Sequence, residues 1–123
     1  MLKQLLFVGI GGASGSILRY MVQKWMLHYY PDSFPLGTFV VNITGCFLIG
    51  LFYGLIPTNT TYGIDLRLLL MTGFCGGFTT FSAFTLEGMT LLESERFLSF
   101  FLYFTLSILL GLSATFFGAM ISR

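Results

Sequence analysis

The chain has 123 residues, of which 55% are hydrophobic and 9% are charged, and its net charge is +1. Soluble domains carry about 25% charged residues, so this chain could not cover a surface that faces water. The near-neutral charge also excludes the basic footprint of a nucleic-acid-binding protein. We therefore expect an all-α integral membrane protein that forms a single domain over residues 1–123.

Long stretches without charge predict four transmembrane helices. A bilayer core of about 30 Å requires about 20 mainly apolar residues in helical conformation. The uncharged stretches predict helices at about residues 2–29, 36–56, 66–92 and 97–121, joined by short connections at 31–35, 57–63 and 93–95. Lys3 and the apolar run after it are typical of a signal peptide, but no small-residue cleavage site follows, so we expect the first helix to be retained.

The first predicted helix contains closely spaced glycines and one arginine. Gly11, Gly12 and Gly15 favour tight helix packing, as small residues do in membranes. Arg19 follows Lys3 by about 24 Å of helix, which puts it near one edge of the hydrocarbon. Its charge either reaches the headgroups or forms a cationic vestibule that gathers anions. The only histidine, His28, is expected at the interface.

The second predicted helix has one strongly polar side chain, Asn42, in the middle of an uncharged stretch. Intramembrane polar groups suggest function by default, and this amide could donate to a passing ligand. Cys46 on this helix and Cys75 on the next are interpreted as small apolar residues. Without further Cys or His at ligand spacing, neither a metal–thiolate site nor a disulfide is expected.

The third predicted helix carries the strongest local signal, the stretch from Gly73 to Phe84. Two adjacent glycines, Gly76 and Gly77, followed by hydroxyl residues predict a helix break in mid-membrane. Such a break persists only when it is buried in protein or lines a cavity. Its free carbonyls could hold a cation and its free N–H groups an anion. Phe81 and Phe84 share a helical face, and two stacked rings with positive edges could line a route for a small anion.

Further polar groups follow this motif. Glu87 is either a residue at the membrane edge or a buried, proton-sensitive group. The fourth predicted helix has a small and polar stripe at i, i+4 spacing that consists of Tyr103, Ser107, Gly111, Thr115 and Ala119. Packing explains the small residues of the stripe, whereas it does not require the hydroxyls.

The distribution of Lys and Arg does not define an orientation in the membrane. One side of the predicted topology has Lys3, Arg67 and Arg123, and the other has Lys24 and Arg96, with Arg19 added if it reaches the same surface. Such an asymmetry normally determines orientation. Either a few neutral contacts decide it, or the chain inserts both ways and forms antiparallel copies, the two-chain counterpart of fused inverted repeats.

Three sequence blocks together resemble the small bacterial fluoride channels of the Fluc/CrcB family. They are Gly12-x-x-Gly15-x-x-x-Arg19-Tyr20, the stretch Leu36–Gly45 around Asn42, and Gly73–Ser82. The resemblance implies a dual-topology antiparallel homodimer in the bacterial inner membrane, with two fluoride pores and a central sodium ion. The sodium ion would be structural and not transported.

The resemblance also implies roles for individual residues. Phe81 and Phe84 would be the pore phenylalanines, with Asn42 as a donor beside them. Backbone carbonyls of Gly76 and Thr79 from both subunits would hold the sodium ion. Arg19 would mark the aqueous vestibule, and the polar track would comprise Thr80, Ser82, Glu87 and Ser107, with Tyr103 and Thr115 matching the polar stripe of the family.

The expected function is passive export of cytoplasmic fluoride, which gives fluoride resistance. Hydrogen fluoride enters as a neutral acid and ionises in the cytosol, and an inside-negative potential drives each anion out by about 2.3 kcal/mol per 100 mV. The sequence has no G-x-x-x-x-G-K-[ST] motif for ATP and no nucleophile–base pair for catalysis. No enzyme activity and no further protein partner are expected.

Two other functions fit the sequence less well. A small proton-coupled drug exporter also has four short helices and inserts in both orientations, but it needs a carboxylate deep in its first helix, where this chain has Arg19. A structural subunit of a larger complex would explain the packing glycines. It would leave the polar set of Asn42, Thr80 and Ser82 unexplained.

Overall fold

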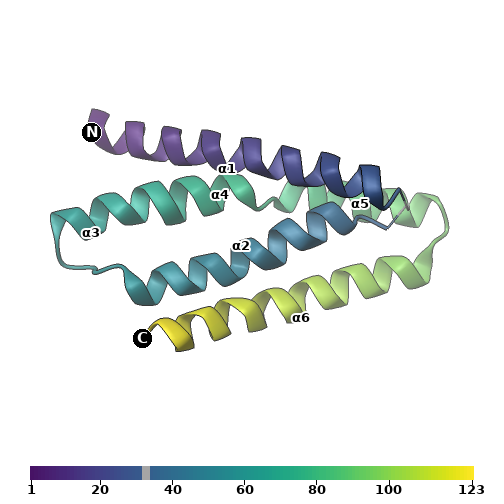
Figure 1. Ribbon diagram of the computed structural model, residues 1–123. Coiled ribbons are helices and arrows are strands. Elements are labelled where there is room, and N and C mark those ends of the chain that lie inside the picture. The colour runs from purple at the N-terminus through teal and green to yellow at the C-terminus, as the bar shows by residue number, and fades with distance from the viewer. Residues whose placement is uncertain (32–33) are drawn as a thin grey trace.

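A computed structural model describes residues 1–31 and 34–123, and its helices run side by side as an elongated bundle (Figure 1). The chain contains α1 (Leu2–Tyr29), α2 (Leu36–Leu55), α3 (Thr61–Leu66), the π-helix η1 (Arg67–Cys75), α4 (Gly76–Phe78), α5 (Phe81–Glu93) and α6 (Phe97–Ser122). Asp32 and Ser33, in the first predicted connection, lie outside the described residues.

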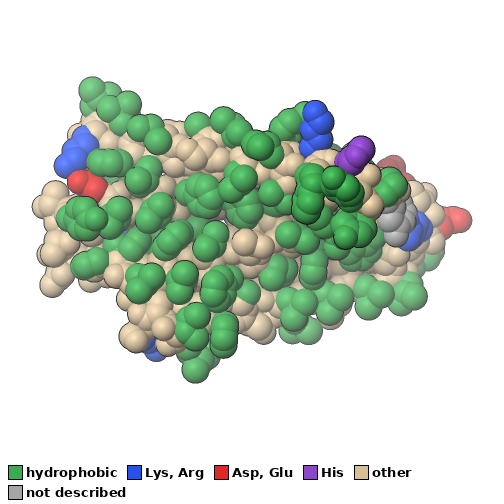
Figure 2. Space-filling view, viewed as in Figure 1, with side chains coloured by type: hydrophobic (Ala, Val, Ile, Leu, Met, Phe, Trp, Pro, Cys, Tyr) green, Lys and Arg blue, Asp and Glu red, His purple; other side chains and the backbone are tan. Residues whose placement is uncertain are grey.

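Four segments are long and apolar enough to cross a membrane, which confirms the prediction of an all-α chain with four spans. They are Leu2–Tyr29, Leu36–Leu55, Thr61–Glu93 and Phe97–Ser122. The two termini lie at the same end of the bundle as the connection between α2 and α3 (Figure 1). Hydrophobic side chains cover the middle of the visible surface, and the charged ones gather toward its two ends (Figure 2).

The third span differs from the expected single helix in its start and its regularity. It begins at Thr61 rather than Leu66, because the Thr60 hydroxyl accepts a hydrogen bond from the Gly63 amide at 2.9 Å and so caps the helix. The connection expected over 57–63 is therefore shorter. Further along, Thr79 and Thr80 are extended, with φ of −87° and −150°, and they separate α4 from α5.

Gly76 and Gly77 are helical, so the expectation that these glycines form the break is wrong. Gly77 is needed for packing. A Cβ there would lie 2.5 Å from the Gly12 carbonyl oxygen and 3.1 Å from the Gly12 Cα of α1. The glycine lets two helix backbones approach closely, as small residues do in membranes.

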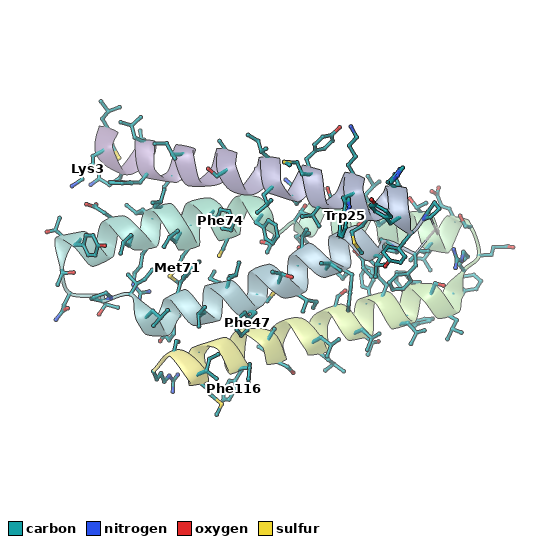
Figure 3. The ribbon with its side chains drawn as sticks, viewed as in Figure 1. Lys3, Trp25, Phe47, Met71, Phe74 and Phe116 are labelled. Carbon is teal, nitrogen blue, oxygen red and sulfur yellow. The ribbon has the colours of Figure 1, made fainter. Side chains whose placement is uncertain are left out.

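Glycines also mediate the packing of α2 against α6, the most extensive helix contact of the fold. A Cβ on Gly50 would overlap the Thr115 carbonyl oxygen, and one on Gly118 would overlap the Phe47 carbonyl oxygen. Phe47 lies between these helices, whereas Phe116, which is 66% exposed, points away from α2 (Figure 3). The largest fully buried side chains of the bundle are Thr38, Val41, Cys75 and Tyr103.

This packing predicts that Gly50→Ala destabilises the fold. The added Cβ meets backbone atoms of α6, so the helix itself must shift to make room. Overpacking of this kind lowers the free energy of unfolding by about 1–3 kcal/mol. Gly9→Ala is the matched control, because Gly9 is also helical and has nothing within 4 Å of its Cβ position. Thermal unfolding of the detergent-solubilised protein measures the difference, and equal unfolding midpoints for the two variants would contradict this account of the α2–α6 contact.

Candidate functional site

A cavity of about 270 Å³ lies beside the extended residues that separate α4 from α5. Its walls come from α2, from the third span and from α6. The cavity is lined by Asn42, Cys46, Thr79, Thr80, Phe81, Phe84, Ser107 and Ile108. Polar and aromatic side chains from three separate membrane spans therefore share one small space.

Asn42 holds the extended segment by two hydrogen bonds to Thr80, which together form the Asn42 clamp. Its Oδ1 accepts from the Thr80 amide at 2.8 Å, and its Nδ2 donates to the Thr80 carbonyl at 3.1 Å. An amide side chain can satisfy a backbone N–H and C=O at once, because it offers both an acceptor and a donor. Within residues 1–31 and 34–123, the other N–H of Asn42 has no partner.

Thr80 starts the next helix. Its hydroxyl accepts from the Ala83 amide at 3.2 Å, which is the N-cap interaction expected of a Thr at this position. The Thr80 amide, which would bond to the Gly76 carbonyl in a continuous α-helix, donates to Asn42 instead. The clamp therefore releases the Gly76 carbonyl from its usual helical partner.

The two phenylalanines occupy different environments in the single chain. Phe84 is 7% exposed and stacks on Phe104 at a centroid distance of 4.3 Å, whereas Phe81 is 76% exposed. Their own rings are 5.9 Å apart and tilted by 45°. The expectation of two stacked rings is therefore wrong, because Phe104 of α6 takes the stacking position against Phe84.

The hydroxyls of the predicted polar track differ in their bonding. The Ser107 Oγ is buried and has no hydrogen-bond partner among the described residues, although it lines the 270 Å³ cavity. Ser82 is exposed, and its Oγ lies 3.4 Å from that of Thr80. Thr115 donates to the Cys46 carbonyl at 3.0 Å and so joins α6 to α2.

A second polar cluster surrounds Glu87. Its Oε1 accepts from the Tyr103 hydroxyl at 3.2 Å and its Oε2 from the Thr38 hydroxyl at 2.9 Å. Thr38 in turn accepts from the Gln23 amide at 2.9 Å. Glu87 is half-buried and lines a cavity of about 450 Å³ together with Gln23 and Thr38.

Sequence reasoning missed Thr38 and Gln23. A signal for both was present, since Thr38 lies four residues before Asn42 and Gln23 four residues after Arg19, on the same helical faces. The two polar clusters are linked by aromatic rings, because the centroid of Phe84 lies 5.0 Å from that of Tyr103.

Arg19 contacts the end of α4. Its Nε donates to the Gly77 carbonyl at 3.0 Å, and the Ser16 hydroxyl lies 3.5 Å from the same oxygen. A cation near the last carbonyls of a helix is stabilised by the partial negative charge there. Arg19 thus compensates a backbone acceptor next to the interruption, while its side chain stays partly exposed.

The residues predicted to hold a cation have the required donor chemistry. Gly76 is exposed, and the atom nearest to its Cβ position is the Met71 carbonyl oxygen at 3.9 Å. Thr79 is extended, which turns its backbone out of the helical register. Hard cations such as sodium are held by carbonyl oxygens in other membrane proteins. Within residues 1–31 and 34–123, no group of three His, Cys, Asp or Glu side chains forms an alternative metal site.

Comparison with known proteins gives full-length matches. The family model described as "CrcB-like protein, Camphor Resistance (CrcB)" matches residues 6–119. A fluoride-specific ion channel FluC of Flavobacterium psychrophilum is 44% identical over 99% of this chain and 98% of the relative. A FluC of Rhizobium etli is 46% identical over 98% of this chain and 96% of the relative. A FluC of Azobacteroides pseudotrichonymphae is 40% identical over 100% of this chain and 98% of the relative.

The clamp predicts that Asn42→Ala destabilises the protein by about 2–5 kcal/mol, because it leaves the N–H and the C=O of Thr80 both without a partner where water is scarce. Thr44→Ala on the exposed face of the same helix is the control. The midpoint of thermal or denaturant-induced unfolding in detergent measures the stability of both variants. Equal midpoints for Asn42→Ala and Thr44→Ala would refute the clamp.

Proposed function

The chain belongs to the CrcB-like family and is a multi-pass bacterial membrane protein and not an enzyme, and we propose that it is a channel that exports cytoplasmic fluoride passively. The relatives that match it over full length carry the name of fluoride-specific ion channels. The family resemblance drawn from the three sequence blocks is confirmed.

One observation carries the proposal, which is that the buried Ser107 hydroxyl in the wall of the 270 Å³ cavity has no hydrogen-bond partner among the residues that the structure describes. A buried hydroxyl without a partner costs free energy, so a transient anion that accepts its hydrogen bond explains why it is there. The same cavity is lined by Asn42, whose amide has a second N–H, and by Phe81 and Phe84. All of these can present positive hydrogens to an anion.

Passage through the membrane requires that such donors replace water. Moving an unpaired ion into an apolar medium costs tens of kcal/mol, and a continuous set of weak donors lowers this barrier. Thr80, Ser82 and Ser107 would form one part of the route. Glu87, Tyr103 and Thr115 would belong to its other parts, and Arg19 would attract anions to the entrance. A small ion approaches more donors at once than a larger one, which favours fluoride over chloride.

We further propose that a second, antiparallel copy covers the interruption. In a membrane, irregular backbone is tolerated only in contact with protein or in a water-filled cavity. Gly76 and Phe81 are both exposed beside the extended residues, so a single chain leaves this region uncovered. The weak charge bias of the sequence supports a partner inserted in the opposite orientation.

A structural sodium ion fits this arrangement. The carbonyls of Gly76 and Thr79 from two copies would supply four oxygens, and the Asn42 clamp makes the Gly76 carbonyl available by engaging the Thr80 amide. The bound cation would compensate the carbonyl ends of two α4 helices. It would hold the two copies together and would not move with the anion.

The direction of transport follows from the chemistry of the ion. Hydrogen fluoride crosses membranes as a neutral molecule and dissociates in a more alkaline cytosol. The inside-negative potential then drives the anion outward through an open pore. The physiological result is resistance to external fluoride.

The proposed function predicts fluoride efflux from liposomes that contain only this purified protein. Efflux should be far faster than from empty liposomes and should exceed chloride efflux, because the donors of a small site fit the smaller anion. Sodium on both sides should support full efflux, and a sodium gradient should add no driving force. A fluoride electrode reads the rate. Absence of efflux would refute the channel, and efflux that scales with the sodium gradient would indicate a symporter.

The ring proposal predicts that Phe81→Ile and Phe84→Ile each reduce fluoride efflux by at least tenfold per folded protein. Isoleucine keeps the position apolar but lacks the positive ring edge. Phe116→Ile, on the exposed face of α6, is the control. Size-exclusion chromatography quantifies the folded dimer. Normal efflux per dimer in both variants would exclude the rings from the pathway.

The antiparallel dimer predicts that charge bias controls activity in cells. Thr58→Lys with Asn59→Lys adds positive charge to one end, and Glu93→Lys with Ser94→Lys adds it to the other, in residues that are exposed. Each biased protein should insert one way and lose fluoride resistance, and co-expression of both should restore it. Full resistance from either biased protein alone would contradict the antiparallel arrangement.

A further inference from the structure

Gln23 of α1 completes a chain of hydrogen bonds that joins four helices. Its Nε2 donates to the Thr38 hydroxyl of α2 at 2.9 Å, and this hydroxyl donates to Glu87 Oε2 of α5 at 2.9 Å. The Tyr103 hydroxyl of α6 donates to the other Glu87 oxygen at 3.2 Å. Thr38 and Tyr103 are 1% and 0% exposed, so both residues that donate to Glu87 are buried.

The backbone leaves room for Gln23 at this point. A Cβ on Gly37 would lie 3.0 Å from the Gln23 Cα and 3.4 Å from its Cγ. Glycine at position 37 therefore lets the stem of Gln23 lie against the first turn of α2, directly beside Thr38. The placement of the amide is thus set by packing as well as by its hydrogen bond.

The direction of each hydrogen bond follows from the atoms involved. The amide nitrogen of Gln23 can only donate, so the Thr38 oxygen accepts from it and has its own proton available for another acceptor. A helical Thr commonly bonds back to a carbonyl of the preceding turn. Here the Gln23 amide holds the Thr38 oxygen from one side, and the hydroxyl proton points to Glu87.

We propose that Gln23 is a positioning residue that orients the Thr38 hydroxyl toward Glu87 and so keeps both oxygens of this carboxylate engaged. The inference rests on the proposed channel function, in which Glu87 belongs to the anion pathway. Without Gln23, Thr38 can turn to its own backbone and Glu87 Oε2 loses its donor. The released carboxylate then competes with a passing anion for hydroxyl donors, and flux decreases.

A double-mutant cycle in liposomes tests whether Gln23 acts through Thr38. Gln23→Met removes the amide at similar size, and Thr38→Val removes the hydroxyl. We expect each to lower fluoride efflux per folded protein about three- to tenfold, and the double variant to be no slower than Thr38→Val alone. Gln4→Met, on the exposed start of the same helix, should leave efflux unchanged. Effects of Gln23→Met and Thr38→Val that multiply would overturn the proposal.

A spectroscopic measurement separates this proposal from the channel function. The infrared carboxylate band of Glu87, assigned by its loss in Glu87→Gln, reports its hydrogen bonds in the purified protein whether or not the protein conducts. Gln23→Met should shift this band and Gln4→Met should not. Gly37→Ala, which crowds Gln23 without removing it, should shift the band in the same direction and serves if Gln23→Met does not fold. If the band does not shift in Gln23→Met and Gly37→Ala, the proposed role of Gln23 is wrong. If the band shifts but the wild-type protein shows no fluoride efflux, only the channel function is refuted.

Discussion

The structure depends on one constraint, which is that every backbone polar group inside a membrane needs a partner from the protein. Lipid offers none, and an unpaired group costs several kcal/mol. At Thr80 the backbone amide gives up its helical hydrogen bond, and two side chains from other helices, together with the Thr80 hydroxyl, supply partners around the interruption. Asn42 pairs with both backbone groups of Thr80, Arg19 pairs with the Gly77 carbonyl, and the Thr80 hydroxyl caps α5. The extended segment exists because these partners surround it.

The glycines make this replacement geometrically feasible. Arg19 can reach the Gly77 carbonyl because α1 lies directly against α4, where a side chain at position 77 would collide with the Gly12 backbone. On the opposite side, Gly45 leaves space for Thr79, since a Cβ at position 45 would overlap the Thr79 side chain. Close approach on both sides holds the extended residues between α1 and α2, and the 270 Å³ cavity forms beside them.

The two polar clusters of the chain are parts of one packed unit. Phe84 lines the cavity next to Asn42, and its ring contacts those of both Tyr103 and Phe104. Tyr103 contacts both sides, because its ring packs on Phe84 while its hydroxyl bonds to Glu87. An ion that moved between the two cavities would pass groups whose positions are coupled through these rings. The buried aromatic rings therefore connect the polar groups of the two cavities mechanically.

The sequence by itself determined the membrane class, the four spans, the family and most residues around the 270 Å³ cavity. These follow from local properties, since hydropathy and charge gaps do not depend on the partner of a segment, and Asn42, Phe84 and Ser107 are conspicuous in apolar helices. Only the tertiary structure decided where the third span leaves the helix. Gly76 and Gly77 have weak helix propensity, but contact with α1 keeps them helical, whereas the Asn42 clamp stabilises the extended conformation at Thr80. Gln23 and Thr38 also gained their roles from tertiary structure, because a polar side chain on one helix becomes part of a site only when other helices bring a carboxylate within hydrogen-bonding distance.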